Sequence, residues 1–439
     1  MSLLFLLNTR PAYFIEREEY FMSDGIIAGE EAVENHGWRV TFAGMGINLA
    51  LGILYTWSVI SKGIPKEWNW SESDKSLPYA VACLIFSIVM VPAGRLQDKI
   101  GPRIVAAVGG ILVGIGFIIA SWTTSPMGYM LGFGTLAGAG IGFGYAAATP
   151  PAVKWFSAAK TGLIAGIVVS GFGLASVYTA PLATFLISKW SINTAVLILG
   201  IAFLIVVVSL AQLLKSPPKG YVPAGAPQLK TTDVNKKVDF VPREMLGTVQ
   251  FYMLWFMYAC GAGAGLMVIA KLASIAKVQA GIDLGFVFVA TLAVGNGAGR
   301  IIAGMASDKI GRKTTMFTCF VFQAVLVLLL SATKTGTAMA NIPTLAIISA
   351  LVGANYGANL SLFPSITKDF YGIKNFGMNY GLIFTAWGVG GFMLSRLAGA
   401  MYDKYQTFAI AYYGASVLLI LAAIMTPFVK TPHRQAENK

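Results

Sequence analysis

Long apolar runs alternate with short polar segments along almost the whole chain after residue 36. A helix needs about 20 mostly apolar residues to cross the hydrocarbon core of a bilayer, and twelve runs reach that length. They cover 38–60, 77–97, 103–122, 127–150, 162–188, 191–214, 247–270, 283–306, 314–334, 343–368, 377–402 and 407–429. The pattern predicts an all-α membrane protein with twelve transmembrane helices.

The composition supports this class. Of the 439 residues, 56% are hydrophobic and only 12% are charged, whereas a soluble protein is about one quarter charged. The net charge of +13 could indicate nucleic-acid binding, but no run of basic and aromatic residues forms a soluble domain for that role. We therefore expect the protein to interact with the lipid bilayer and not with nucleic acid.

The distribution of Lys and Arg predicts the orientation. An even number of spans places both termini on one side of the membrane. With the termini inside, 22 of the 32 cations lie in inner tails and loops, eight, including Lys271, lie in outer loops, and two lie within spans. Cytoplasmic loops carry the excess of positive charge, so we predict a multi-pass protein of the cell (inner) membrane with both termini cytoplasmic.

The longest hydrophilic gap, 215–245, is rich in Lys and Pro and divides the spans six and six. GRLQDKIGPR at 94–103 and GMASDKIGRK at 304–313 repeat each other across this gap, which indicates an internal duplication. We predict two pseudo-symmetric six-helix bundles. The predicted segments are a cytoplasmic tail at 1–36, bundles at 37–214 and 246–430, a cytoplasmic linker at 215–245 and a tail at 431–439. Met22 offers an alternative start.

Arg300 is a cation deep inside the eighth span. It precedes Asp308, at the predicted end of the span, by eight residues, or about 12 Å of helix, against a half-thickness of about 15 Å. A charge at this depth costs roughly 3 kcal/mol or more and normally faces a cavity and a counter-charge. No acidic residue lies at comparable depth, so a substrate anion is the natural partner. The alternative is a structural arginine bonded to helix carbonyls or to a buried acid.

Two further polar residues lie near the same depth. Asn296 precedes Arg300 by one helical turn and shares its face. It can bind a substrate hydroxyl or carbonyl, orient Arg300, or do both. Tyr145 in the fourth span is about 12 Å from the inner end. Its hydroxyl can meet the same anion from the other bundle, or its ring can pack between glycine-rich helices.

Charged turns follow the second and eighth spans. Asp98 with Arg103, and Asp308 with Arg312, pair acids with cations where helices end. We predict that they latch the inner face when the outer face is open. Arg396, near the outer end of the eleventh span, is predicted to act as a structural gate or to interact with a helix dipole rather than to bind substrate.

The Gly-x-x-x-Asp-x-x-Gly-x-Arg loop at 94–103 and its second copy resemble the signature of the major facilitator superfamily. TLAGAGIGFGYAAA (135–148), NGAGRIIAGMASDKIGR (296–312) and LFPSITKDFYGIKNFGMNYG (362–381) resemble the monocarboxylate transporters and the oxalate–formate antiporters, and most of all a bacterial lactate-type member. The resemblance implies the two-bundle fold and a substrate-binding role for Arg300. It also implies cavity positions at Leu54, Tyr55, Tyr356, Asn359 and Phe384.

Differences from these families narrow the range of substrates that we expect. Trp387 occupies the position of the second cation of the oxalate exchanger, so a single deep arginine would leave a dianion half paired. Val59 and Asn296 replace the lysine and acid of animal monocarboxylate transporters, which leaves the proton route open. We predict a secondary active transporter that moves a small, lactate-like monocarboxylate with a proton by alternating access. The alternative is a carboxylate anion exchanger of the oxalate–formate type.

Other classes of function fit the sequence less well. A receptor normally needs a sizeable soluble output domain, and the largest loop has about thirty residues. The chain carries no cofactor-binding motif, metal-ligand spacing or catalytic triad, so we expect neither an enzyme nor a cofactor. The oligomeric state is left open, with a monomer as one option.

Overall fold

The computed structural model describes residues 25–27, 32–157, 160–218, 221–223, 239–372 and 375–432. Twelve helical segments within them are long and apolar enough to cross a membrane. The first six are α1–η1–α2 (Gly37–Leu51, Gly52–Thr56, Trp57–Lys62), α3 (Glu72–Ile100), α4 (Pro102–Ser121), α5–η3–α6 (Pro126–Tyr129, Met130–Ala137, Gly138–Val153), α7 (Thr161–Lys189) and α8 (Ile192–Ala211). The last six are α10 (Val249–Val278), α11 (Gly285–Ile310), α12 (Arg312–Ser331), α13 (Ile342–Tyr371), α14 (Phe376–Tyr405) and α15 (Ala409–Met425).

Short elements connect or flank these helices. They are η2 (Lys66–Trp68), α9 (Pro242–Leu246), η5 (Ala338–Ala340) and η6 (Thr426–Phe428). Three short strands, β1 (Gly25–Ile27), β2 (Ala32–Val33) and β3 (Tyr221–Val222), form an antiparallel sheet in the order β2-β1-β3. The predicted fold class is confirmed. The domain boundaries remain predictions, and the start at Met22 lies outside the described residues.

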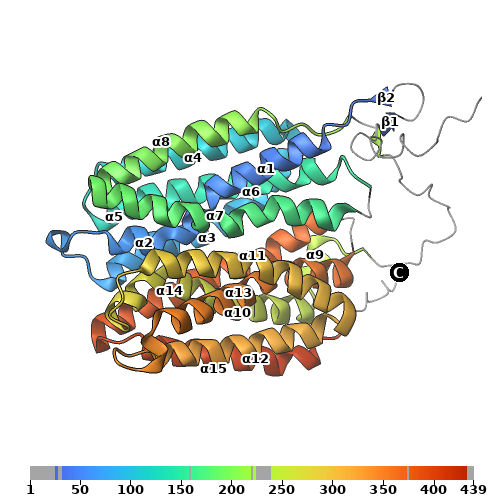
Figure 1. The fold of residues 1–439 in the computed structure, drawn as a ribbon. Helices are drawn as coiled ribbons and strands as arrows, with labels where there is room; N and C mark the ends of the chain where they lie inside the picture. Colours follow the sequence, from blue (N-terminus) through green and yellow to red (C-terminus); the bar gives the residue numbers. More distant parts are fainter. Residues whose placement is uncertain are drawn as a thin grey trace, which may run out of the picture.

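The helices form two bundles, α1–α8 and α10–α15, that lie side by side in Figure 1. They meet mainly where α3 packs against α14 and α7 packs against α11. One end of the molecule carries the start of α1 and the end of η6, and we call it the terminal face. The opposite end carries the α2–α3 and α10–α11 connections, and we call it the distal face.

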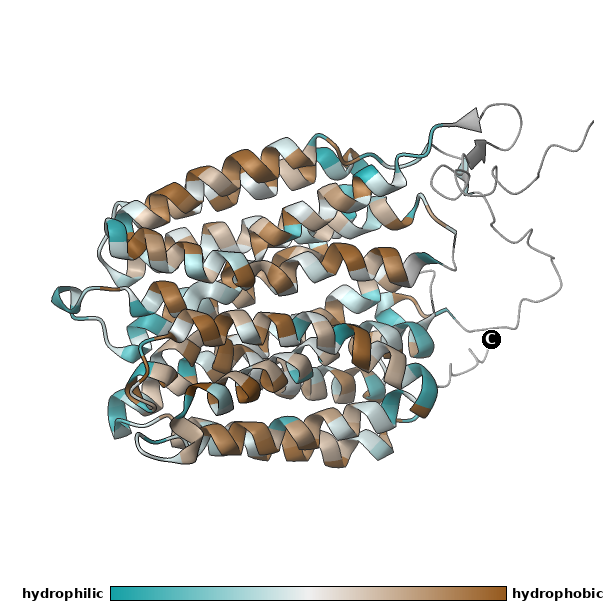
Figure 2. Ribbon diagram, in the orientation of Figure 1, coloured by the Kyte–Doolittle hydropathy of each residue, from teal (hydrophilic) through white to brown (hydrophobic). Residues whose placement is uncertain are grey.

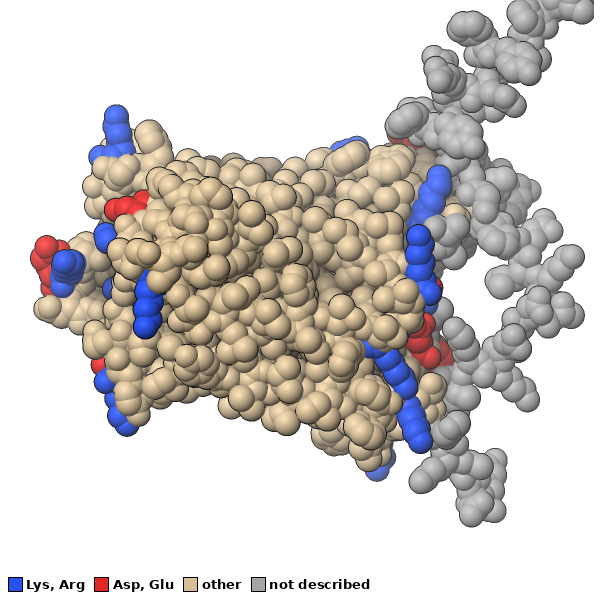
Figure 3. Space-filling view, turned by 60° about the horizontal axis from the view of Figure 1, so that its bottom comes forward, with Lys and Arg blue, Asp and Glu red and all other residues tan. Residues whose placement is uncertain are grey.

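A belt of apolar surface surrounds the bundles between these two faces. Figure 2 shows hydrophobic residues along the outer sides of the helices, and Figure 3 shows charged side chains gathered at the two ends. Large apolar side chains such as Ile301 and Met393 are about 60% exposed within this belt. Lipid tails would cover such side chains, and the chain is therefore a multi-pass membrane protein.

Several helices extend beyond their apolar runs. Helix α10 continues to Val278 rather than ending near residue 270. The prediction that Lys271 lies in a loop is therefore wrong: its side chain is buried within α10 and is ion-paired with Glu72 at 2.9 Å. The helix can extend because its buried cation finds a partner in the other bundle, which hydropathy along one segment does not reveal.

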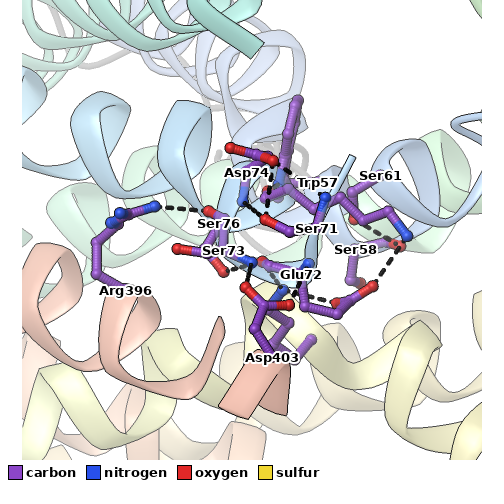
Figure 4. A network of polar contacts seen from close by, with 12 residues as sticks. Trp57, Ser58, Ser61, Ser71, Glu72, Ser73, Asp74, Ser76, Arg396 and Asp403 are labelled. Carbon is purple, nitrogen blue, oxygen red and sulfur yellow. Dashed lines mark hydrogen bonds and ion pairs between the residues drawn. The ribbon is translucent and has the colours of Figure 1, made fainter. Parts of the chain in front are cut away.

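A polar network closes the distal face between the two bundles (Figure 4). The two carboxylate oxygens of Asp403 on α14 accept hydrogen bonds from the backbone N–H groups of Glu72 and Ser73, each at 2.8 Å. Arg396 donates to the carbonyl of Ser73 at 2.6 Å, and its role remains a prediction. Lys271 donates to both the carbonyl and the carboxylate of Glu72. A negative charge is favourable at a helix N-terminus, so Asp403 caps α3 from the opposite bundle.

Candidate functional site

Arg300 lies on α11 at the seam between the two bundles. Helix α11 approaches α13 so closely that a Cβ at Gly299 would lie 2.0 Å from the carbonyl oxygen of Ala354. Only glycine permits this contact. The close packing fixes the face of α11 that carries Arg300 and turns it toward α7, the helix of the other bundle that it meets.

The guanidinium group of Arg300 is only partly satisfied by the protein. Its Nε donates to Asn296 Oδ1 at 3.2 Å, and Nη1 donates to the carbonyl oxygen of Val169 on α7 at 2.9 Å. Nη2 is buried without a hydrogen-bond partner in the described part of the chain, and so is Nδ2 of Asn296. No ion pair with an acid is found for Arg300 among the described residues. This pairing leaves donors free beside a positive charge, as an anion site requires.

A narrow space next to Arg300 is enclosed by aromatic side chains from both bundles. The lining residues are Tyr55, Phe86, Tyr145, Phe172, Arg300, Leu360, Phe384 and Trp387. Tyr145 and Phe384 stack with ring centroids 6.4 Å apart, one from each bundle. The space is too tight for a water molecule, so the rings must move apart to admit a ligand. An apolar wall with one fixed cation suits a small organic anion.

Three buried side chains, one from the first bundle and two from the second, form hydrogen bonds beside this space. The hydroxyl groups of Tyr55 and Tyr356 are 2.6 Å apart and join the two bundles. Trp387 Nε1 donates to the same Tyr356 oxygen at 2.8 Å. Arg300 and Tyr145, in contrast, are only partly buried.

The structure brings most of the predicted site residues together. Tyr55, Tyr145, Arg300 and Phe384 line the space, while Asn296 and Tyr356 contact its members through the hydrogen bonds above.

Two predicted residues do not line it. Leu54 is fully buried beside Tyr55. Asn359 donates to the carbonyl of Asn355, and its Oδ1 lies 2.7 Å from where a Cβ on Gly261 would be, so it faces α10.

Sequence reasoning missed part of the site. Phe86, Phe172 and Leu360 line the space, and the Val169 carbonyl binds Arg300. Aromatic residues in apolar spans carry no signal that separates a site from ordinary packing. A carbonyl acceptor carries no side-chain signal at all. The glycine at 173 is a hint that another group approaches α7 closely, because a Cβ there would lie 3.2 Å from Arg300 Nη2.

The four predicted gating residues lie at the terminal face, and the contacts found for them stay within one bundle. Asp98 pairs with Lys154 at 3.3 Å, and Arg103 donates to the Leu214 carbonyl at 2.8 Å. Arg312 pairs with Asp308 at 2.7 Å and with Asp369 at 3.1 Å. Among the described residues, every hydrogen bond found between the bundles lies at the distal face or at the site. This pattern describes a distally closed state, and the latch remains a prediction for the opposite state.

No metal site is found in the part of the chain that the structure describes, where no cluster of three or more His, Cys, Asp or Glu residues could hold an ion.

The sequence profile of the Major Facilitator Superfamily matches residues 41–295 and 274–439. Among curated proteins, the chain is 29% identical over 357 residues to the MFS-type transporter YhjX of Escherichia coli K12, covering 80% of this chain and 85% of that protein. It is 28% identical to the oxalate:formate antiporter of Oxalobacter formigenes, covering 87% and 89%. It is 25% identical to mouse monocarboxylate transporter 11, covering 88% and 85%.

A solved structure shares the fold. It is a bacterial homologue of the human lysosomal transporter Spinster, described as inward-facing and unoccupied. The two superpose with a TM-score of 0.67 at 15% sequence identity, covering 91% of this chain and 98% of the other. This likeness concerns the arrangement of the helices.

Proposed function

Because this chain belongs to the Major Facilitator Superfamily and is a transporter, we propose that it moves a small, lactate-like monocarboxylate together with a proton by alternating access. The observation that carries the proposal is the guanidinium group of Arg300. It lies at the seam of the two bundles with Nη2 unpartnered and with no acid bonded to it in the described chain. A carboxylate matches the planar fork of an arginine.

The charge and walls of the site favour a small monovalent anion. Arg300 is the one cation among the lining residues, so a dianion would keep one carboxylate unpaired in an apolar space, at a high cost in free energy. Trp387 occupies the position where the oxalate exchanger would have its second cation. Relatives named for oxalate, formate and monocarboxylates support small carboxylates as the substrate class.

The orientation follows from the charge bias of the loops. We propose that the terminal face is cytoplasmic and the distal face is external, in the cell (inner) membrane, because most Lys and Arg outside the spans fall on the terminal side. In this orientation the distal network would close the outer side of the carrier. The predicted latches at Asp98–Arg103 and Asp308–Arg312 would then form when the outer side opens.

Charge balance favours co-transport of a proton. Uptake of an anion alone against an inside-negative potential costs about 2.3 kcal/mol per 100 mV for each charge. A proton that moves with the anion cancels this cost. It can travel on the substrate carboxyl group or on a protein group, and the site itself contains no histidine or acid among its lining residues.

Uptake of labelled lactate into proteoliposomes tests the proposal. An imposed inward proton gradient, with no anion inside, should drive accumulation, and a proton-conducting ionophore should abolish it. Uptake that appears only when a carboxylate is loaded inside would instead favour the alternative, an anion exchanger. The absence of both would contradict carboxylate transport.

The pH dependence of uptake should not arise from the Lys62–Asp283 ion pair at the distal face. A hydrogen bond from Lys62 lowers the pKa of Asp283 below its ordinary value of 3.8. An acid with a depressed pKa keeps its ion pair at higher pH and loses it only as the pH falls through the folded-state value. The carboxylate therefore stays charged between about pH 5 and pH 8.

We expect Asp283→Asn to leave the shape of the uptake–pH profile unchanged over this range. Initial uptake rates of wild type and variant, measured at several pH values, check this expectation. A shifted midpoint in the variant would show that Asp283 titrates within this range.

A further inference from the structure

We infer that the backbone carbonyl of Val169 and the bare surface of Gly173 on α7 hold Arg300 while the carrier is empty, in place of the substrate carboxylate. This contact would let the carrier without substrate switch its binding site back to face the other side of the membrane. The inference rests on the proposed function. It assigns a positioning role to a segment of α7 for which the sequence offers no charged or polar side chain at the point of contact.

Two positions on α7, Val169 and Gly173, contact the guanidinium group of Arg300. Nη1 lies 2.9 Å from the Val169 oxygen. A Cβ at Gly173, one helical turn further along the same face of α7, would lie 3.2 Å from Nη2 and 3.3 Å from Cζ. The guanidinium group therefore rests flat on the helix, and it can do so only because residue 173 has no side chain. Gly173 is itself buried.

The partner that α7 provides is incomplete. A carbonyl dipole satisfies one donor of Arg300, but within the described ranges of the chain its positive charge has no counter-ion and Nη2 has no acceptor. A carboxylate offers a full negative charge and two oxygens. A substrate can therefore displace the α7 contact, whereas the empty site still has an acceptor that lowers the cost of the buried cation.

The strength of this α7 contact, relative to that of a bound carboxylate, affects whether the protein can carry out net uptake or only exchange. In exchange, the carrier switches between its outward-facing and inward-facing states only when substrate is bound. In net uptake, it must also switch once in every cycle without substrate, while the charge of Arg300 lies near the middle of the membrane. The Val169–Gly173 contact joins the two bundles at the site, as does the Tyr55–Tyr356 hydrogen bond. We therefore expect it to favour net uptake over obligatory exchange.

Gly173→Ala tests the inference, with Gly166→Ala as the matched control. An added methyl group at residue 173 pushes the guanidinium group away by a few tenths of an ångström and weakens the bond to Val169, while Arg300 can still reach a substrate. Gly166 lies on the same helix, and a Cβ there meets no atom within 4 Å. The control therefore reproduces the helix-stiffening effect of alanine without touching Arg300.

Two rates are measured for each protein in the same proteoliposomes: proton-driven net uptake of labelled lactate into empty vesicles, and exchange of labelled for unlabelled lactate at saturating substrate on both sides. For Gly173→Ala we expect the ratio of net uptake to exchange to fall at least about threefold. The ratio for Gly166→Ala should equal that of wild type.

Each other outcome has a distinct meaning. Equal loss of both rates in Gly173→Ala, or no loss in either, would overturn the inference, as would an equal fall of the ratio in Gly166→Ala. A wild-type protein that neither takes up nor exchanges any carboxylate would instead contradict the proposed function. Detergent-extracted Gly173→Ala should show the wild-type elution volume and melting temperature, so that a folding defect is detected separately.

Discussion

Arg300→Lys should lower kcat/KM for carboxylate uptake by about tenfold to a hundredfold. Lysine keeps the positive charge but replaces the planar fork with a single ammonium group. It loses the Nε bond to Asn296 and cannot present a second N–H edge to the substrate while it is bonded to Val169. A hydrogen bond to a charged group contributes about 1.5–3 kcal/mol, and about 1.4 kcal/mol corresponds to a factor of ten.

Initial uptake rates over a range of lactate concentrations measure this effect. Arg95→Lys provides the control, because Arg95 is exposed near the terminal end of α3, away from the site. It should behave as wild type. An Arg300→Lys protein with wild-type kcat/KM would show that charge alone is recognised, or that the substrate binds elsewhere.

Asp403→Asn should shift the carrier toward the distally open state by about tenfold or more. The carboxylate accepts two backbone hydrogen bonds at the start of α3, each worth about 1.5–3 kcal/mol because the acceptor is charged. An amide has one acceptor oxygen, and its NH₂ group would face a backbone N–H. The variant therefore loses one bond, gains a repulsive contact and removes the negative charge from the helix N-terminus.

The native Cys83 reports this opening. Its side chain is fully buried and lies 3.2–3.4 Å from where a Cβ on Gly391 of α14 would be, so it becomes accessible when α3 and α14 separate. In a Cys260→Ser, Cys319→Ser background, a membrane-impermeant thiol reagent applied from the distal side should label Cys83 about tenfold faster in Asp403→Asn than in the parent.

Lys404→Gln is the neighbouring control. Lys404 lies over the ring of Tyr405 rather than against α3, and its replacement should leave the labelling rate unchanged. Equal labelling of Asp403→Asn and parent would show that the cap does not hold the distal face closed.

The broad architecture could be predicted from the sequence, and so could the positions of Arg300 and Asn296 at the polar centre of the candidate site. Hydropathy marks each span locally, and the duplicated loops at 94–103 and 304–313 reveal the two bundles. Arg300 stands out because a deep charge is costly whatever surrounds it. Asn296 follows from helical periodicity alone, since residues four apart share a face, and its Oδ1 indeed accepts from Arg300.

The remaining features depend on which helix faces which. Asp403 and Glu72 are 331 residues apart in sequence, and nothing near either residue indicates their contact. Lys271 looks like a loop cation until Glu72 from the other bundle is placed beside it. Phe86 and Trp387 are apolar residues within apolar runs, and only their meeting, with ring centroids 5.1 Å apart, makes them walls of one space. Local pattern cannot supply these pairings.

Binding of lactate and of its uncharged amide to the purified protein, measured by titration calorimetry for wild type and Arg300→Gln, tests the central claim most directly. The amide has nearly the same size and keeps the hydroxyl group but lacks the negative charge. We predict that wild type binds lactate and not the amide, and that Arg300→Gln binds neither. Equal binding of acid and amide to wild type, or undiminished binding of lactate to Arg300→Gln, would contradict an anion site at Arg300.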